Sequence, residues 1–186
     1  MDTTEWVMLA IVVGVVLAAI ALMTYGRSRR TTSLRDRFGP EYERTVGEAG
    51  SRRAAERELL DREQRFESLD IQPLSEAARS RYTEDWDRAE RMFVDDPELA
   101  AREADRIVRG VLDERGYPND DLDTRIAAVS VDHPRAVQRY RHGHEMVHSN
   151  GNGQERTESL RVAMTDFRVV FEEMVEPEPE RELAPR

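Results

Sequence analysis

Three of the four histidines lie within residues 142–148, where their spacing allows metal chemistry. His144, Glu145 and His148 match the pattern H-E-x-x-H. On a helix, the two histidines of this pattern lie one turn apart on one face and can both bind zinc, and the glutamate can act as general base on the bound water. The first function that the sequence raises is therefore a zinc-dependent hydrolase using His144, Glu145 and His148.

The surrounding sequence gives this zinc hypothesis little support. Where the longer metzincin pattern has a third histidine, this chain has Gln154, which does not suit zinc. Glu172 or Glu173 could in principle supply a carboxylate instead. His144 also falls on an apolar helical stripe, where a packed histidine needs no metal. We therefore assign no catalytic, cofactor-binding or metal-binding residue, and we expect no cofactor.

An acidic cluster formed by Asp120, Asp121 and Asp123 raises a second metal hypothesis, a calcium loop. The segment lacks the central glycine and the distal bidentate glutamate of an EF-hand. Helix capping and turn formation explain these aspartates better. The chain also has no P-loop, no dinucleotide-binding glycine pattern and no nucleophile elbow, and these absences favour a non-enzymatic protein.

The composition excludes several classes of protein. The chain has no cysteine, which excludes disulfides, thiolate zinc sites and cysteine catalysis. All 28 basic residues are arginine. Beyond residue 30 there are 36 acidic residues and 25 arginines, a net charge of −11. Because nucleic acids are polyanions, this acidic body disfavours them as partners.

Residues 6–25 form one uncharged stretch that begins with Trp6 and ends with Tyr25. As a helix, a stretch of this length reaches about 30 Å, the thickness of the hydrocarbon core of a bilayer. The residues before it include Asp2 and Glu5 but no basic residue, whereas a signal peptide begins with a basic segment. We therefore expect an uncleaved transmembrane anchor.

Arginines follow this stretch but do not precede it, at positions 27, 29, 30, 35 and 37. Basic flanks stay in the cytoplasm, so we expect a single-pass protein of the cell membrane with its N-terminus outside and its helical domain in the cytoplasm. The same arginines could also rest on anionic lipids. Ala10, Gly14 and Ala18 have the four-residue spacing of closely packed helix dimers, which leaves a homodimer open.

Apolar residues after the anchor recur with helical spacing, and no strand-like alternation is present. Expected helix boundaries are marked by Ser51 and Ser75 as N-caps, by Asp96 with Pro97, and by Gly116. The last helix is expected to begin near Thr157. The residues expected to be buried on the three longest helices are Ala78, Tyr82, Trp86, Ala89 and Phe93, then Leu99, Ala100, Ala104, Ile107, Val108, Val111 and Leu112, then Leu160, Met164, Phe167, Phe171 and Met174.

These patterns predict an all-α protein, in which one N-terminal transmembrane helix precedes an irregular antiparallel bundle of five or six amphipathic helices. We divide the chain into an anchor (residues 1–28), a juxtamembrane segment (29–50), a helical domain (51–175) and an acidic tail (176–186). The tail alternates glutamate and proline at its start and has little to bury, so we expect it to be disordered.

Five short motifs carry a resemblance to a known family. They are RFGPEY at residues 37–42, LDIQPLS at 69–75, FVDDP at 93–97, GYP at 116–118 and SVDHP at 130–134. Over residues 34–175, the chain resembles a family of uncharacterised bacterial proteins that pair an N-terminal hydrophobic segment with a helical domain. The resemblance implies the same architecture, and it implies no activity, cofactor or site residue.

Two functions from different classes therefore remain. The sequence favours a non-enzymatic interaction or scaffold domain held at the cytoplasmic membrane, with the lipid bilayer and a protein partner or a second copy of the chain as its partners. The alternative is the zinc-dependent hydrolase.

Overall fold

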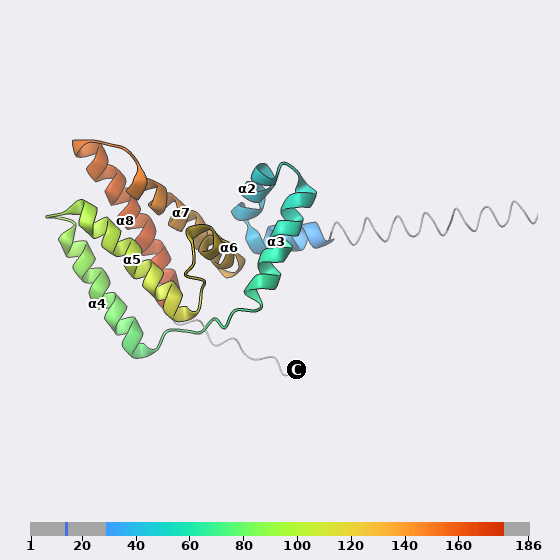
Figure 1. The fold of residues 1–186 in the computed structure, drawn as a ribbon, viewed down its shortest axis with the longest axis horizontal. Helices are drawn as coiled ribbons and strands as arrows, with labels where there is room; N and C mark the ends of the chain where they lie inside the picture. The colour runs from blue at the N-terminus through green and yellow to red at the C-terminus, as the bar shows by residue number, and fades with distance from the viewer. Residues whose placement is uncertain (1–13, 15–28, 177–186) are drawn as a thin grey trace, which may run out of the picture. The chain divides into compact units, whose positions relative to one another are not determined.

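The computed structural model describes residue 14 and residues 29–176, and every regular element among these residues is an α-helix (Figure 1). Residues 29–38 are helical, and seven further helices follow in this described part of the chain. They are α2 (Pro40–Ala49), α3 (Arg52–Phe66), α4 (Glu76–Met92), α5 (Pro97–Arg115), α6 (Leu122–Asp132), α7 (Pro134–His148) and α8 (Gly153–Val175). The predicted all-α class and helical bundle are confirmed for these residues, but they contain eight helices instead of the predicted five or six, because residues 29–38 and α2 form separate short helices.

The predicted anchor lies outside the described residues, apart from Gly14, which is helical. A search of the described residues finds no helix with the length and apolar character needed to cross a bilayer. Residues 177–186, which make up nearly all of the predicted disordered tail, also lie outside them. The anchor, its orientation and the tail remain predictions.

The chain divides into two compact units between Glu56 and Arg57, within α3. In the first unit, Gly39 has a φ of +48° and separates helical residues 29–38 from α2. Leu34, Phe38 and Tyr42 are buried. Tyr42 Oη donates a 3.1 Å hydrogen bond to Glu56 Oε1 at the start of α3, so a polar contact joins the segments of this unit.

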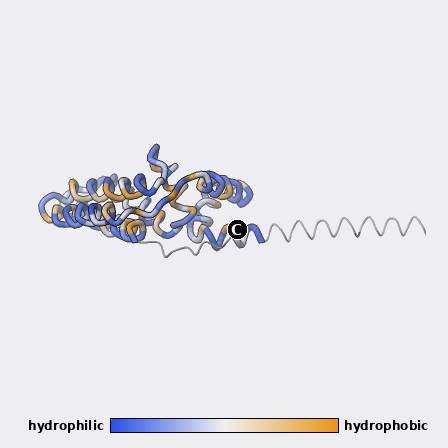
Figure 2. The backbone as a smooth tube through the Cα atoms, turned by 90° about the horizontal axis from the view of Figure 1, so that it is seen from below, coloured by the Kyte–Doolittle hydropathy of each residue, from blue (hydrophilic) through white to orange (hydrophobic). Residues whose placement is uncertain are grey.

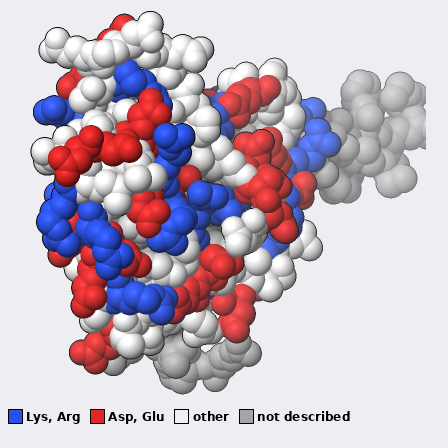
Figure 3. All heavy atoms as spheres, turned by 60° about the vertical axis from the view of Figure 1, so that its left-hand side comes forward, with Lys and Arg blue, Asp and Glu red and all other residues white. Residues whose placement is uncertain are grey.

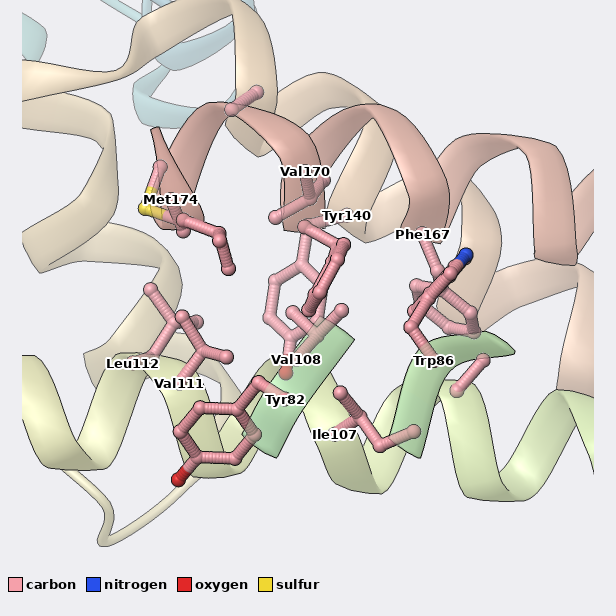
Figure 4. Close-up of a cluster of buried hydrophobic side chains, with 14 of the residues drawn as sticks. Tyr82, Trp86, Ile107, Val108, Val111, Leu112, Tyr140, Phe167, Val170 and Met174 are labelled. Atoms are coloured by element: carbon pink, nitrogen blue, oxygen red, sulfur yellow. The ribbon is translucent and has the colours of Figure 1, made fainter. Parts of the chain in front are cut away.

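The second unit has its core among α4, α5, α7 and α8. Helix α8 packs against both α5 and α7, α4 packs against α5, and α6 packs against α7. Aromatic and aliphatic side chains from these helices converge in the core, as Figure 4 shows. Figure 2 shows the sequence basis of this packing, since apolar residues recur between polar ones along the helices instead of forming long runs.

Side-chain caps fix the starts of α4, α5 and α6. Ser75 accepts a 3.1 Å hydrogen bond from the backbone N–H of Ala78, and Asp96 accepts a 3.0 Å bond from that of Leu99. Asp121 caps α6 through a 2.8 Å bond from the N–H of Thr124, which lowers the pKa of its carboxyl. The capping role predicted for the cluster of Asp120, Asp121 and Asp123 is thus confirmed for Asp121.

Leu99 is 48 % exposed, so its predicted burial is wrong. The buried residues of α5 run from Ala100 to Arg115. At about 100° per residue, Leu99 lies about 160° from the centre of the arc that they form. The first turn of α5 therefore carries Leu99 on its solvent side.

Helix α8 begins at Gly153, four residues before the predicted start at Thr157. The additional turn carries Arg156, whose guanidinium donates to the backbone oxygens of Met146, Val147 and Ser149 at the end of α7. Carbonyls at a helix C-terminus have no intrahelical donor, and the Arg156 guanidinium supplies donors to those of this segment. The contact between Arg156 and the end of α7 thus stabilises a first turn of α8 that the glycine-rich sequence alone does not favour.

Candidate functional site

The three clustered histidines lie on the C-terminal half of α7, and each ring has a different partner. His142 Nδ1 lies 2.5 Å from Asp166 Oδ2 on α8. His144 Nε2 lies 2.9 Å from Asp105 Oδ1 on α5. His148 Nδ1 donates to the backbone oxygen of His144 at 2.8 Å.

The two histidines of the H-E-x-x-H pattern lie on one face, as helical spacing predicts, with ring centroids 5.7 Å apart and planes 6° from parallel. Glu172 pairs with Arg168, and Glu173 lies 2.8 Å from His133 Nδ1, so both proposed third ligands have other partners. Among the described residues, no group of three or more histidine or acidic side chains could hold a metal ion. Within residues 29–176, the geometry therefore places no third histidine or carboxylate ligand beside His144 and His148.

His144 instead belongs to a buried polar cluster, made of Asp105, Tyr140 and His144, that joins α5 to α7. Tyr140 is fully buried, and its ring meets that of His144 edge to face at 5.2 Å. Arg109 Nε lies 3.1 Å from the other carboxylate oxygen of Asp105. The cluster places His144 as a packed histidine next to a carboxylate.

Three atoms of this cluster lack an aligned hydrogen bond within the part of the chain that the structure describes. They are Tyr140 Oη, Asp105 Oδ1 and His144 Nε2. The last two are close in distance but poorly aligned, so their contact is mainly electrostatic. Buried polar atoms without hydrogen bonds are costly, which makes this cluster a weak point of the core.

We expect Tyr140→Phe to keep or raise stability at pH 7 and to protect the fold at alkaline pH. Burial, together with the charge of Asp105, raises the pKa of Tyr140 to about 12, whereas an unfolded tyrosine ionises near pH 10. The folded state thus binds the proton more tightly, so stability from this group is full below pH 10 and is lost as pH rises from 10 to 12. By pH 11 the loss is about 1.4 kcal/mol, and the variant escapes it. Urea denaturation at pH 7, 9, 10 and 11 measures the difference.

Tyr82→Phe is the matched control at neutral pH. The Tyr82 hydroxyl donates a 2.9 Å hydrogen bond to Glu114, so its removal should cost about 1 kcal/mol at pH 7. Equal losses at pH 7 for Tyr82→Phe and Tyr140→Phe would show that the Tyr140 hydroxyl is bonded in solution.

A second candidate site, separate from the polar cluster, is a surface groove of about 440 Å³ between α4 and α8. Its apolar part contains Trp86 of α4 stacked on Phe171 of α8, with ring centroids 4.7 Å apart. Glu90 joins the two helices, since it accepts 2.9 Å hydrogen bonds from Trp86 Nε1 and Arg168 Nη1. The charged residues that line this α4–α8 groove are Arg79, Asp87, Arg168, Glu172 and Glu176.

Sequence periodicity located Trp86 and Phe171 but missed the partners of the histidines. Asp105 and Asp166 are buried. Their burial was missed because each lies in a helix whose other charged residues mostly face solvent. Their spacing is the one available signal: each lies on the helical arc of buried neighbours, Asp105 beside Ala104 and Val108, and Asp166 beside Ala163. A charge on a buried arc indicates a paired group.

No family model, no curated protein and no solved structure matches this chain. The resemblance to the family of bacterial helical proteins therefore stays a prediction.

Proposed function

We propose that this chain is a single-pass membrane protein whose helical domain lies on the cytoplasmic side and binds a protein partner without catalysing a reaction. The observation that carries the proposal is the uncharged stretch of residues 6–25, followed by five arginines and preceded by none. A folded helical body then supplies the interacting part.

The surface of the helical body supports a protein partner better than a nucleic acid. Figure 3 shows that arginines and acidic residues are interspersed on the face in view, without a continuous basic stripe. The α4–α8 groove adds aromatic floor residues between charged edges of both signs. This chemistry fits an amphipathic helix from a partner protein, whose charged side chains would pair with the groove edges above the nearly buried Trp86 and Phe171, which are 3 % and 5 % exposed.

The absence of cysteine allows a direct test of topology. We expect Thr3→Cys to react with a membrane-impermeant maleimide in intact cells. Asn150→Cys, in the exposed loop between α7 and α8, should react only after permeabilisation. Labelling with the opposite pattern would reverse the orientation, and recovery of the chain in the soluble fraction would remove the anchor.

Site-specific photo-crosslinking tests the groove as the partner surface. A photoreactive residue at Thr83, which is exposed in the groove, should give one dominant adduct in membranes. The same residue at Arg102, which is exposed on α5, should not give that adduct. Identical adduct patterns at both positions, or none at either, would contradict binding at the groove.

A further inference from the structure

The helix formed by residues 29–38 has two chemically distinct sides. Leu34 and Phe38 are buried in the first unit. The other side is exposed and forms a shallow surface depression. Its lining residues, called the arginine face below, are Arg29, Thr32, Ser33, Asp36 and Arg37.

The charge of this segment is opposite to that of the rest of the body. Residues 27–37 contain five arginines and one aspartate, Asp36. From residue 38 to the end there are 23 arginines and 35 acidic residues. The arginine face is therefore a cationic segment of an otherwise acidic chain, and it would attract an anionic partner more than the net-acidic remainder does.

Chain length fixes how far this face can lie from a bilayer. Arg29 follows Tyr25 by four residues, which span at most about 14 Å even when fully extended. The polar headgroup layer is about 5–8 Å thick on each side of the hydrocarbon core. The negative surface potential extends about 8 Å further at physiological salt. With residues 6–25 in the membrane, Arg29 lies within this zone, and Thr32, Ser33 and Arg37 follow it within about 12 Å along the helix axis.

The side chains on this face suit a phosphate ligand. The planar guanidinium groups of Arg29 and Arg37 match two phosphate oxygens at once, and the hydroxyls of Thr32 and Ser33 can donate further hydrogen bonds. Asp36 opposes an anion, but two arginines on the same face outnumber it. All five residues of the arginine face are exposed to solvent.

We propose that the arginine face binds the phosphate groups of anionic phospholipids in the leaflet that faces the helical domain. This inference rests on the proposed membrane anchor. It adds a lipid preference to that anchor and assigns the preference to residues 29–37. Each arginine near a charged surface contributes about 1 kcal/mol, so even one net contact gives about a fivefold preference.

The test uses the full chain reconstituted in phosphatidylcholine vesicles with spin-labelled lipid probes. We expect spin-labelled phosphatidylglycerol to be immobilised by the protein about fivefold more strongly than spin-labelled phosphatidylcholine at 50 mM salt. The preference should fall toward one at 0.5 M salt because screening weakens exposed charges. A ratio near one at low salt would overturn the proposal.

Matched variants assign the preference to this face. Arg29→Gln and Arg37→Gln, combined with Arg30→Gln at the exposed position next to the face, should abolish it, while lysine at the same three positions should retain a weaker preference. Glutamine at Arg102, Arg106 and Arg161 removes the same charge from exposed positions of the second unit and should leave the ratio unchanged. A preference that survives the first triple variant would contradict the assignment.

Alkaline carbonate extraction of the same vesicles separates the two proposals. If the chain is extracted, the anchor itself has failed. If the chain stays in the membrane but shows no preference for the anionic lipid, only the lipid inference fails.

Discussion

Replacing Gly116 with alanine is expected to lower the free energy of unfolding by about 3–5 kcal/mol. Gly116 ends α5 with a φ of +97°, a conformation that costs an alanine about 1–2 kcal/mol. A Cβ at this position would also lie 2.4 Å from the backbone oxygen of Asp70. That backbone is held nearby by the 2.8 Å hydrogen bond from the N–H of Gln72 to the oxygen of Arg115, so it cannot move aside cheaply. Urea denaturation monitored by circular dichroism gives the value.

Gly153→Ala is the control that separates the cost of a positive φ from the cost of the steric clash. Gly153 also has a positive φ, +56°, but a Cβ there meets nothing within 4 Å. Its replacement should cost only about 1 kcal/mol. If the two alanine variants lose the same stability, the close approach of Asp70 to Gly116 does not exist in solution.

Arg115→Ala is expected to destabilise the fold by about 3–4 kcal/mol. The side chain is only 2 % exposed, and its Nη1 donates a 3.1 Å hydrogen bond to the backbone oxygen of Met174 near the end of α8. Its guanidinium also lies over the ring of Tyr117 at 5.8 Å. Alanine would leave both a cavity and a buried carbonyl without its donor, which are additive costs. Thermal and urea unfolding measure the loss.

Arg102→Ala provides the comparison on the same helix. Arg102 is exposed and pairs with Glu98 one turn away, an interaction worth less than about 0.5 kcal/mol. Arg115→Lys should recover part of the loss, since an ammonium can reach a carbonyl but lacks the planar group over Tyr117. A loss at Arg115 no larger than that at Arg102 would contradict the capping role.

Both variants act at the C-terminal end of α5, where the sequence was only partly informative. Gly116 was predicted as a helix terminator, since glycine after a periodic stripe is a strong local signal. The burial of Arg115 was not predicted, because an arginine in the last turn of a helix is usually exposed and interacts with the helix dipole. Its contact with Met174 spans 59 residues, and no local pattern encodes a separation of that length.

The candidate site, too, was predicted only in part from the sequence. Helical periodicity placed His144 on the buried stripe of α7, and the structure has its side chain 16 % exposed beside Tyr140. The H-E-x-x-H match depends on local spacing alone. The carboxylate next to His144 Nε2 belongs to Asp105 on another helix. Sequence reasoning could therefore raise the zinc hypothesis but could not show which group lies beside that nitrogen.

The order of the helices along the chain affects how this core is made. Helices α5 and α7 both pack against α8, which follows them in the sequence, so neither apolar face is covered until α8 has been synthesised. Ribosomes add about 5–20 residues per second, so the 23 residues of α8 take about 1–5 s. During this interval the incomplete core would expose apolar side chains to solvent. Rapid docking of α8, or a chaperone that covers these side chains, would then decide the yield of folded protein.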